Sequence, residues 1–318
     1  MRKRETVSGD SQIVFDRAVL RHRRNRTASR AGDHDFLFRE VADRLVERLA
    51  DVARTFEFAL DIGARDGLLA DTLRDSGRVG QMMLCDRSPV YAKQAAVRGY
   101  PSFVADEDLL PLKEETFDLI TSCLALHWVN DLPGSLVQIN RALKPDGLFQ
   151  GVIFGGETLT ELRQCLMEAE LAEMGGVSPR ISPMVDLRDA AGLLQRAGFA
   201  LPVADMDRID VSYTDPFHLM ADLRAMGEAN AVLERLKHGT RRSVFMRAAE
   251  LYAARFGGPD GRITARFDVI FLHGWRPAAS QPKPLSPGSA TTRLADALGA
   301  EEIPTGDRVR PKGPGHSD

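Results

Sequence analysis

The sequence contains no long hydrophobic run, and this absence sets a first limit on the class of protein. No apolar stretch in its 318 residues approaches the roughly 20 residues that a membrane-spanning helix needs. Met1 to Asp10 are polar and lack an apolar signal core, so we expect neither a transmembrane segment nor secretion. An obvious import presequence is also missing. This favours a cytoplasmic bacterial protein, and a mitochondrial matrix location applies only if the chain is eukaryotic.

Cysteine is scarce. The chain has three, Cys85, Cys123 and Cys165, and none of them stands in a CxxC pair. Their odd number and wide spacing argue against a disulfide framework and against a zinc site. We therefore predict reduced, mostly buried thiols and no bound metal. A non-haem iron site would need two histidines and a carboxylate, and the one H-x-D triplet is His316-Ser317-Asp318 at the end of the sequence.

A large excess of charge is lacking as well, since the formal net charge is -3. This balance gives no general reason to bind nucleic acid. The N-terminal region is locally basic, and we interpret its arginines as the solvated face of a helix rather than as a phosphate-binding patch. They are Arg17, Arg21, Arg23, Arg24 and Arg26.

Short apolar strands alternate with helical segments through the first half of the sequence. This alternation predicts βαβ units and a Rossmann-like, mostly parallel sheet. Two later strands, Arg208–Tyr213 and Arg266–Trp275, are expected to form an antiparallel edge, and Lys144–Gly147 is expected to be a turn. The earlier strands are predicted at Phe58–Ile62, Met82–Cys85, Pro101–Val104, Phe117–Ser122 and Leu148–Phe154.

Composition and periodicity divide the chain into three regions. We predict an N-terminal helical cap over residues 1–50 and a main domain over residues 51–276. A helical insertion at about 214–257 should hold helices within Phe217–Arg235 and Ser243–Phe256. The proline-rich residues 277–318 are predicted to form a disordered tail, because they cannot bury enough apolar surface to offset the entropy of ordering.

A glycine turn between the first strand and its helix is the first candidate binding site. Ligands of open parallel sheets bind at the carboxyl ends of the strands, and glycines let the backbone approach them. A nicotinamide-binding turn would read G-x-G-x-x-G, whereas this one reads G-x-x-x-G after Asp61. Asp61 suits the ammonium and sulfonium of S-adenosylmethionine. The alternative is a structural turn of the kind found in any α/β protein.

Acidic residues also end the next two strands. Asp86 can accept both hydroxyls of a ribose, and Asp106 can accept from an adenine amino group. We interpret Asp108 as ordinary solvated charge. The sites are weak singly, but together they follow successive strands in the order that a nucleoside pocket requires. The predicted cofactor-binding residues are Asp61, Gly63, Gly67, Asp86, Arg87, Asp106, Glu107, Ser122 and Leu124.

His127 is the candidate catalytic residue, because it follows the fourth strand and could take a proton from an amine or amide acceptor. Trp128 beside it would form a wall of the acceptor pocket. A histidine at a helix start is equally often a packing or capping residue. Arg180, Arg224 and Asn230 are candidates for contacts with an acidic or peptide acceptor, and their alternative is ordinary surface.

These motifs resemble two known groups of proteins. Asp61 to Gly67, Asp86, Asp106 and Phe117-Asp118 are similar to the motifs of class I adenosylmethionine-dependent methyltransferases. A closer resemblance, to the mitochondrial complex I assembly factor family, runs from about Ile13 into the C-terminal region. It is carried by Ile13–Arg17, Leu126–Pro133, Leu143–Gly147, Phe154–Leu159, Ser178–Pro183 and Met226–Asn230.

The resemblance implies an adenosylmethionine-binding enzyme that modifies a protein. Members of the family are described as arginine hydroxylases acting on an iron-sulfur subunit of respiratory complex I. A more distant similarity, to malonyl-carrier-protein methyltransferases, implies a carrier protein as the alternative substrate. A non-catalytic assembly chaperone is the third alternative. It is favoured by Arg65, which stands where the family has a glycine and would weaken cofactor binding.

Overall fold

The computed structural model describes residues 13–29, 32, 34–281 and 292–300. The chain divides into two units, 1–279 and 280–318. Among its described residues the second unit holds a short helix, α10 (Leu294–Leu298), and the remainder of the predicted tail lies mostly outside the described residues. No helix in the described part of the chain has the length and apolar composition to cross a membrane.

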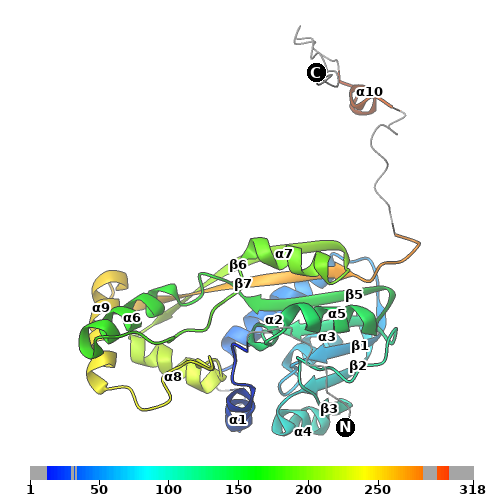
Figure 1. Cartoon of the computed structure of the whole chain (residues 1–318). Helices are drawn as coiled ribbons and strands as arrows, with labels where there is room; N and C mark the ends of the chain where they lie inside the picture. Colours follow the sequence, from blue (N-terminus) through cyan, green and yellow to red (C-terminus); the bar gives the residue numbers. More distant parts are fainter. Residues whose placement is uncertain (1–12, 30–31, 33, 282–291, 301–318) are drawn as a thin grey trace, which may run out of the picture. The chain divides into compact units, whose positions relative to one another are not determined.

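One seven-stranded sheet organises the first unit, in the order β3-β2-β1-β4-β5-β7-β6 (Figure 1). The strands β1 to β5 are parallel, and β7 pairs antiparallel with both β5 and β6. The predicted parallel sheet with an antiparallel edge is therefore confirmed. The strands are β1 (Phe56–Ile62), β2 (Val79–Asp86), β3 (Ser102–Val104), β4 (Phe117–Cys123), β5 (Leu143–Phe154), β6 (Ala200–Tyr213) and β7 (Ile263–Trp275).

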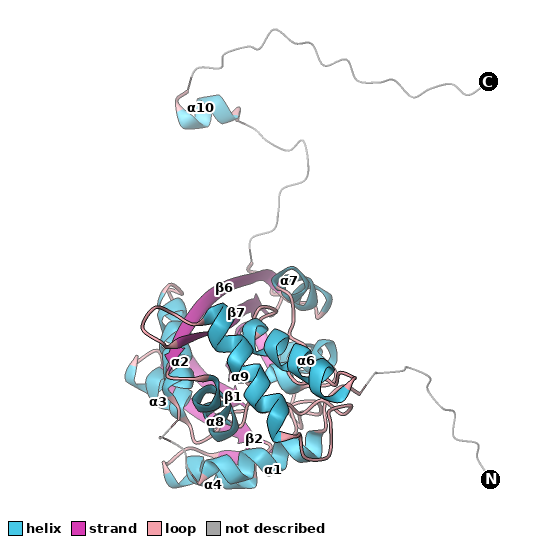
Figure 2. Ribbon diagram, turned by 90° about the vertical axis from the view of Figure 1, so that its left-hand side faces the viewer, coloured by secondary structure: helices cyan, strands magenta, loops and turns pink. Residues whose placement is uncertain are grey.

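Helices cover both faces of this sheet (Figures 1 and 2). The strand residues Ala59 and Leu119 join one core with α2, α3, α6, α8 and α9, whereas Leu60 and Ile120 join a second core with α5 and α7. This alternation follows from the two-residue period of a strand. The helices are α1 (Arg17–Ala28), α2 (Phe36–Ala50), α3 (Leu68–Asp75), α4 (Pro89–Val97), α5 (Leu132–Ala142), α6 (Thr160–Met174), α7 (Leu187–Arg196), α8 (Pro216–Met226) and α9 (Arg242–Phe256).

The order of the strands in the sheet determines where the candidate binding site lies. Strand order reverses between β1 and β4, so the segments after these two strands meet at the carboxyl edge, where α/β proteins bind ligands. Helix α1 lies beside α4 at this edge in both views. It begins after Asp16, whose carboxylate accepts a hydrogen bond from the N–H of Val19 and so caps the helix.

The predicted turn at Lys144–Gly147 is wrong, because these residues belong to β5. Phe117 pairs with Leu143 but Leu119 pairs with Leu148, so the extra residues form a bulge against β4. The proline and glycine that indicate a turn are also residues that a bulge accommodates, and a local pattern cannot distinguish the two.

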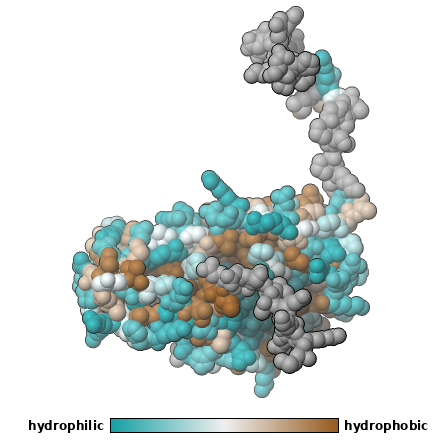
Figure 3. Space-filling model, in the orientation of Figure 1, coloured by the Kyte–Doolittle hydropathy of each residue, from teal (hydrophilic) through white to brown (hydrophobic). Residues whose placement is uncertain are grey.

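A helix was predicted within Phe217–Arg235, and α8 occupies the first part of this range and ends at Met226. Gly227 has a φ of 86° and ends α8 in the left-handed conformation that glycine adopts readily. The residues beyond it form an irregular segment that returns toward α1. Helices α8 and α9 lie with α6 at one end of the unit, where Figure 3 shows apolar surface gathered among polar residues.

Candidate cofactor and acceptor site

The glycine turn after β1 is tightly packed. Gly63 has a φ of 68°, and a Cβ added to it would lie 2.2 Å from the Cβ of Ala125 in the segment after β4. Asp61 just before it is buried, and its Oδ1 accepts a hydrogen bond from the Thr121 hydroxyl at 3.0 Å. Its Oδ2 accepts no hydrogen bond from any residue that the structure describes. Burial, the largest cause, raises the pKa of Asp61 to about 7.

Arg65 departs from the family loop but does not extend into solvent. Its guanidinium carbon lies 3.9 Å from the ring centroid of Phe38 and its nitrogens donate to the Met226 carbonyl and the Tyr91 hydroxyl, each at 3.1 Å. The side chain therefore joins α2, α4 and the end of α8. Its φ of 54° is in the left-handed region, where a glycine is less strained. Gly67 ends the turn with a φ of 95°.

Asp86, the predicted ribose ligand, is buried and already accepts three hydrogen bonds. Its Oδ2 accepts from Nη2 of Arg24 at 2.7 Å and from the N–H of Arg65 at 3.0 Å, and its Oδ1 accepts from the N–H of Ser88 at 2.7 Å. Arg24 also donates to the Gly63 carbonyl at 3.0 Å. Burial raises the pKa of Asp86, and Arg24 opposes this effect.

The interpretation of the N-terminal arginines as a solvated face is therefore wrong for two of them. Arg24 is buried, and Arg17 is largely covered by an acidic cluster after β3. Arg21 and Arg26 are exposed, as expected of a solvated face. The basic composition is visible in the sequence, but the carboxylates that it meets are far away along the chain.

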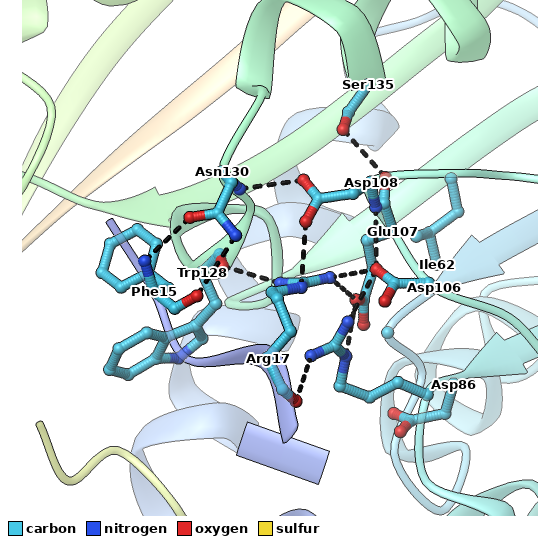
Figure 4. A network of polar contacts seen from close by, with 12 residues as sticks. Phe15, Arg17, Ile62, Asp86, Asp106, Glu107, Asp108, Trp128, Asn130 and Ser135 are labelled. Carbon is cyan, nitrogen blue, oxygen red and sulfur yellow. Dashed lines mark hydrogen bonds and ion pairs between the residues drawn. The ribbon is translucent and has the colours of Figure 1, made fainter. Parts of the chain in front are cut away.

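Two arginines pair with an acidic cluster after β3, and Figure 4 shows this cluster with Arg17. Arg17 pairs with Asp106, with Glu107 at 2.6 Å and with Asp108 at 3.0 Å. Arg87 pairs with Asp106 at 2.6 Å and Glu107 at 3.0 Å. The Glu107 side chain is 3% exposed, so a full negative charge there depends on these cations. Together the five residues close the edge of the sheet beside α1.

Asp108 is not the solvated charge that we expected. It accepts hydrogen bonds from the backbone N–H groups of Asn130 and Asp131, at 2.8 and 3.2 Å. The Asn130 side chain in turn bonds the backbone of Phe15 in the segment before α1 (Figure 4). Asp108 therefore connects the loop after β3 with the loop before α5.

Two predicted cofactor residues make contacts within the scaffold. The hydroxyl of Ser122 donates to the Ile62 carbonyl at 2.9 Å, and the N–H of Leu124 donates to the Val152 carbonyl at 2.9 Å. Both are buried, and Leu124 has a φ of 50°. These contacts fix the segment after β4 against the glycine turn.

His127 forms a pair with a carboxylate that the sequence did not reveal. Its Nε2 lies 3.1 Å from Oε2 of Glu228, which also accepts from Nε1 of Trp128 at 2.8 Å. Burial alone would raise the pKa of Glu228, but the hydrogen bond with His127 and the positive charges of Arg65 and Arg24 lower it, which favours the carboxylate form. Nδ1 of His127 is buried and has no hydrogen-bond partner within the described part of the chain. The nearest sequence signal was the family-like segment Met226–Asn230.

The site fits a nucleoside cofactor with cationic and hydroxyl groups. Among the described residues, Oδ2 of Asp61 and Oε1 of Glu107 are buried acceptors without a hydrogen-bond partner, and such atoms are rare unless a ligand or water supplies the donor. The turn at Gly63 offers no room for a side chain. One adjustment is needed. The Arg24 guanidinium must move away from Asp86 before the two ribose hydroxyls can donate hydrogen bonds to both carboxylate oxygens of Asp86.

Metal-binding side chains do not gather in the described part of the chain, where no group of three is found. His316-Ser317-Asp318 lies outside the described residues. The three cysteines are buried and free, as predicted.

Comparisons with known proteins identify the family and the fold. A methyltransferase domain family matches residues 60–150. The "Arginine-hydroxylase NDUFAF5, mitochondrial" of Danio rerio is 41% identical over 92% of both chains. The "Malonyl-[acyl-carrier protein] O-methyltransferase" of Halorhodospira halophila is 33% identical over 84% of this chain and 90% of its own. The crystal structure of the YcgJ protein from Bacillus subtilis shares the fold, with a TM-score of 0.52 at 17% identity, and covers 75% of this chain and 99% of that one. The chain therefore belongs to the NDUFAF5 family of methyltransferase-fold proteins.

Proposed function

We propose that this chain binds S-adenosylmethionine and modifies a side chain of a protein, in an arginine hydroxylase-like role during assembly of respiratory complex I. The matched methyltransferase domain and the NDUFAF5 relatives support this proposal. Its main structural support is the unpartnered Oδ2 of Asp61 at the glycine turn. We further propose that the protein acts in the bacterial cytoplasm on an iron-sulfur subunit.

The residues have separate roles in this proposal. Asp61 and Glu107 would accept from the cofactor, and Asp86 would hold its ribose once Arg24 has moved. Where the modification is a methyl transfer, bound adenosylmethionine would supply an electrophilic methyl group on its sulfonium. Glu228 orients the ring of His127, and this pair would take a proton from a nitrogen acceptor. Burial of His127 and Trp128 excludes water from the acceptor side.

The pH dependence of binding tests the cofactor assignment. Because the pKa of Asp61 is about 7, its carboxylate form increases as pH rises through 7. We expect calorimetry to show tighter binding of adenosylmethionine and adenosylhomocysteine at pH 8 than at pH 6, on the order of 10-fold. Methylthioadenosine lacks the α-ammonium and should show no such change. Asp61→Asn should remove the dependence.

The same variant has a stability signature. The raised pKa means that the folded state binds more protons than the unfolded state between the ordinary value of 3.8 and about 7, so Asp61 lowers stability progressively as pH rises through this window. Asp61→Asn should therefore gain stability relative to wild type between pH 4 and 8.

Tight binding of NAD with no binding of the adenosyl compounds would contradict the proposed function.

The carrier-protein alternative follows from the second relative. It predicts methyl ester formation on malonyl-carrier protein by the purified protein, whereas the leading proposal predicts loss of complex I assembly in a deletion strain. A non-catalytic chaperone would restore assembly even when His127 and Glu228 are both replaced.

The Glu228 contacts give a further prediction. Its lowered pKa contributes stability that is present above its unfolded value, 4.5, and is lost as pH falls below it. Glu228→Gln should reduce the free energy of unfolding by about 1–3 kcal/mol at pH 7 and remove this acid-dependent part. Urea unfolding followed by tryptophan fluorescence measures both effects. The control is Glu173→Gln on the exposed face of α6, and equal losses in the two variants would contradict the prediction.

A further inference from the structure

A groove of about 260 Å³ lies beside the site, between α1, α6, α8, α9 and the segments after α6 and α8. It is at the end of the unit where apolar surface gathers in Figure 3. Its floor is apolar, and the side chains that form it belong to, or pack against, the core that Ala59 and Leu119 share with α6, α8 and α9. They are Leu162, Leu166, Ile181, Met220, Leu223 and Phe245.

The groove reaches the predicted acceptor site through Glu228. This carboxylate lines the groove and also two narrow cavities beside it, one against Phe154 and Thr158 and the other against Arg24 and Glu107. Glu228 forms hydrogen bonds with both His127 and Trp128. A substrate segment lying in the groove would therefore present a side chain to the His127–Glu228 pair.

Arginines border the groove, and two of them are neutralised by carboxylates. Arg180 pairs with Glu170 at 2.5 Å, and Arg235 pairs with Asp16 at 3.0 Å. These pairs hold the segments after α6 and α8 in place. Arg180 was predicted from the sequence as an acceptor contact, but its guanidinium is already occupied. Asn230 was also predicted as an acceptor contact. Its side chain donates to the Pro179 carbonyl at 2.7 Å and so connects the segments after α6 and α8.

The other two arginines of the border have no carboxylate within 4 Å among the described residues. Arg23 donates to the carbonyls of Ala229 and Asn230, each at 2.6 Å, and Arg224 is exposed at the end of α8. Burial, Arg235 and Arg26 lower the pKa of Arg23, and the nearby Asp16 offsets only part of this effect. Arg224 also borders an adjoining hollow with Arg26. The groove is therefore apolar at its floor and cationic along its border.

We propose that this groove binds a segment of the substrate protein in which acidic side chains alternate with apolar ones. The apolar residues would cover the floor, and the carboxylates would pair with Arg23 and Arg224. This inference rests on the proposed function, since it specifies the substrate of the same site. A nucleic acid would also neutralise arginines, but binding of single strands depends on aromatic stacking, and among the lining residues only Phe245 is aromatic.

Two fluorescein-labelled peptides test this proposal by fluorescence anisotropy. The acidic peptide has the sequence GDLELDG, and the neutral one, GNLQLNG, differs only in its charges. We expect the acidic peptide to bind wild-type protein more tightly, and Arg23→Gln/Arg224→Gln to weaken it at least about 10-fold while the neutral peptide changes little. The control, Arg188→Gln/Arg196→Gln, removes two exposed arginines of α7 and should leave binding unchanged.

Several results would overturn the proposal. One is an equal loss of peptide binding in the control variant, and another is equal binding of the acidic and neutral peptides by wild-type protein. The others are no binding of the acidic peptide by wild-type protein, and its displacement by an oligothymidine at a lower concentration than the unlabelled acidic peptide requires. Calorimetry with adenosylmethionine on the same variants separates this proposal from the proposed function. Intact cofactor binding with no peptide binding rejects the groove alone, whereas peptide binding without cofactor binding rejects the proposed function.

Discussion

Gly63→Ala is expected to destabilise the protein by about 3 kcal/mol and to abolish cofactor binding. The added Cβ would lie 2.2 Å from the Cβ of Ala125, far inside van der Waals contact. Both atoms are attached directly to the backbone, so neither can rotate away, and the turn must separate from the segment after β4. The positive φ at Gly63 adds the cost of placing an alanine in the left-handed region.

Two matched variants separate these costs. Gly99 has a φ of 93°, and a Cβ added there would meet no atom within 4 Å, so Gly99→Ala reports the backbone cost alone, about 1 kcal/mol. In Gly63→Ala/Ala125→Gly the colliding methyl group is removed, and most of the steric loss should be recovered. Denaturant unfolding is measured on wild-type protein and on the four variants, which include Ala125→Gly. Strict additivity of the two single changes would show that the collision is not the cause.

The parts of the site that the sequence predicted are those set by local signals. Asp61, Gly63 and Asp86 could be placed because a strand followed by a turn puts its last residues at the carboxyl edge of a parallel sheet. The strands themselves were found because β4 and its neighbours are short apolar runs, which is typical of strands buried on both faces.

The parts that the sequence missed depend on partners that are distant along the chain. Arg24 and Asp86 are 62 positions apart, and His127 and Glu228 are 101 positions apart. A basic helix has the same composition whether it faces water or a buried carboxylate, so periodicity could not distinguish the two. Asp108 was misinterpreted for the same reason, since its donors come from the loop before α5.

Arg24→Gln should have two opposite effects, lower stability and tighter cofactor binding. The guanidinium is the cation that pairs with buried Asp86, and it lies 3.8 Å from Glu107. Its removal leaves a buried carboxylate without its counterion and should cost about 3 kcal/mol of unfolding free energy. Burial already raises the pKa of Asp86, so uptake of a proton by this carboxylate should offset part of the cost as the pH falls.

The gain in binding follows from competition for the same oxygens. In wild-type protein a ribose must displace Arg24 from Asp86, and this cost is absent in Arg24→Gln. The stabilisation by saturating adenosylmethionine should therefore be larger in the variant by about 1.4 kcal/mol, which corresponds to a 10-fold tighter complex. Thermal unfolding with and without the ligand measures it, with Arg21→Gln on the exposed side of α1 as the control. Weaker binding in Arg24→Gln would instead mean that this arginine contacts the ligand itself, and that α1 completes the cofactor site rather than covering it.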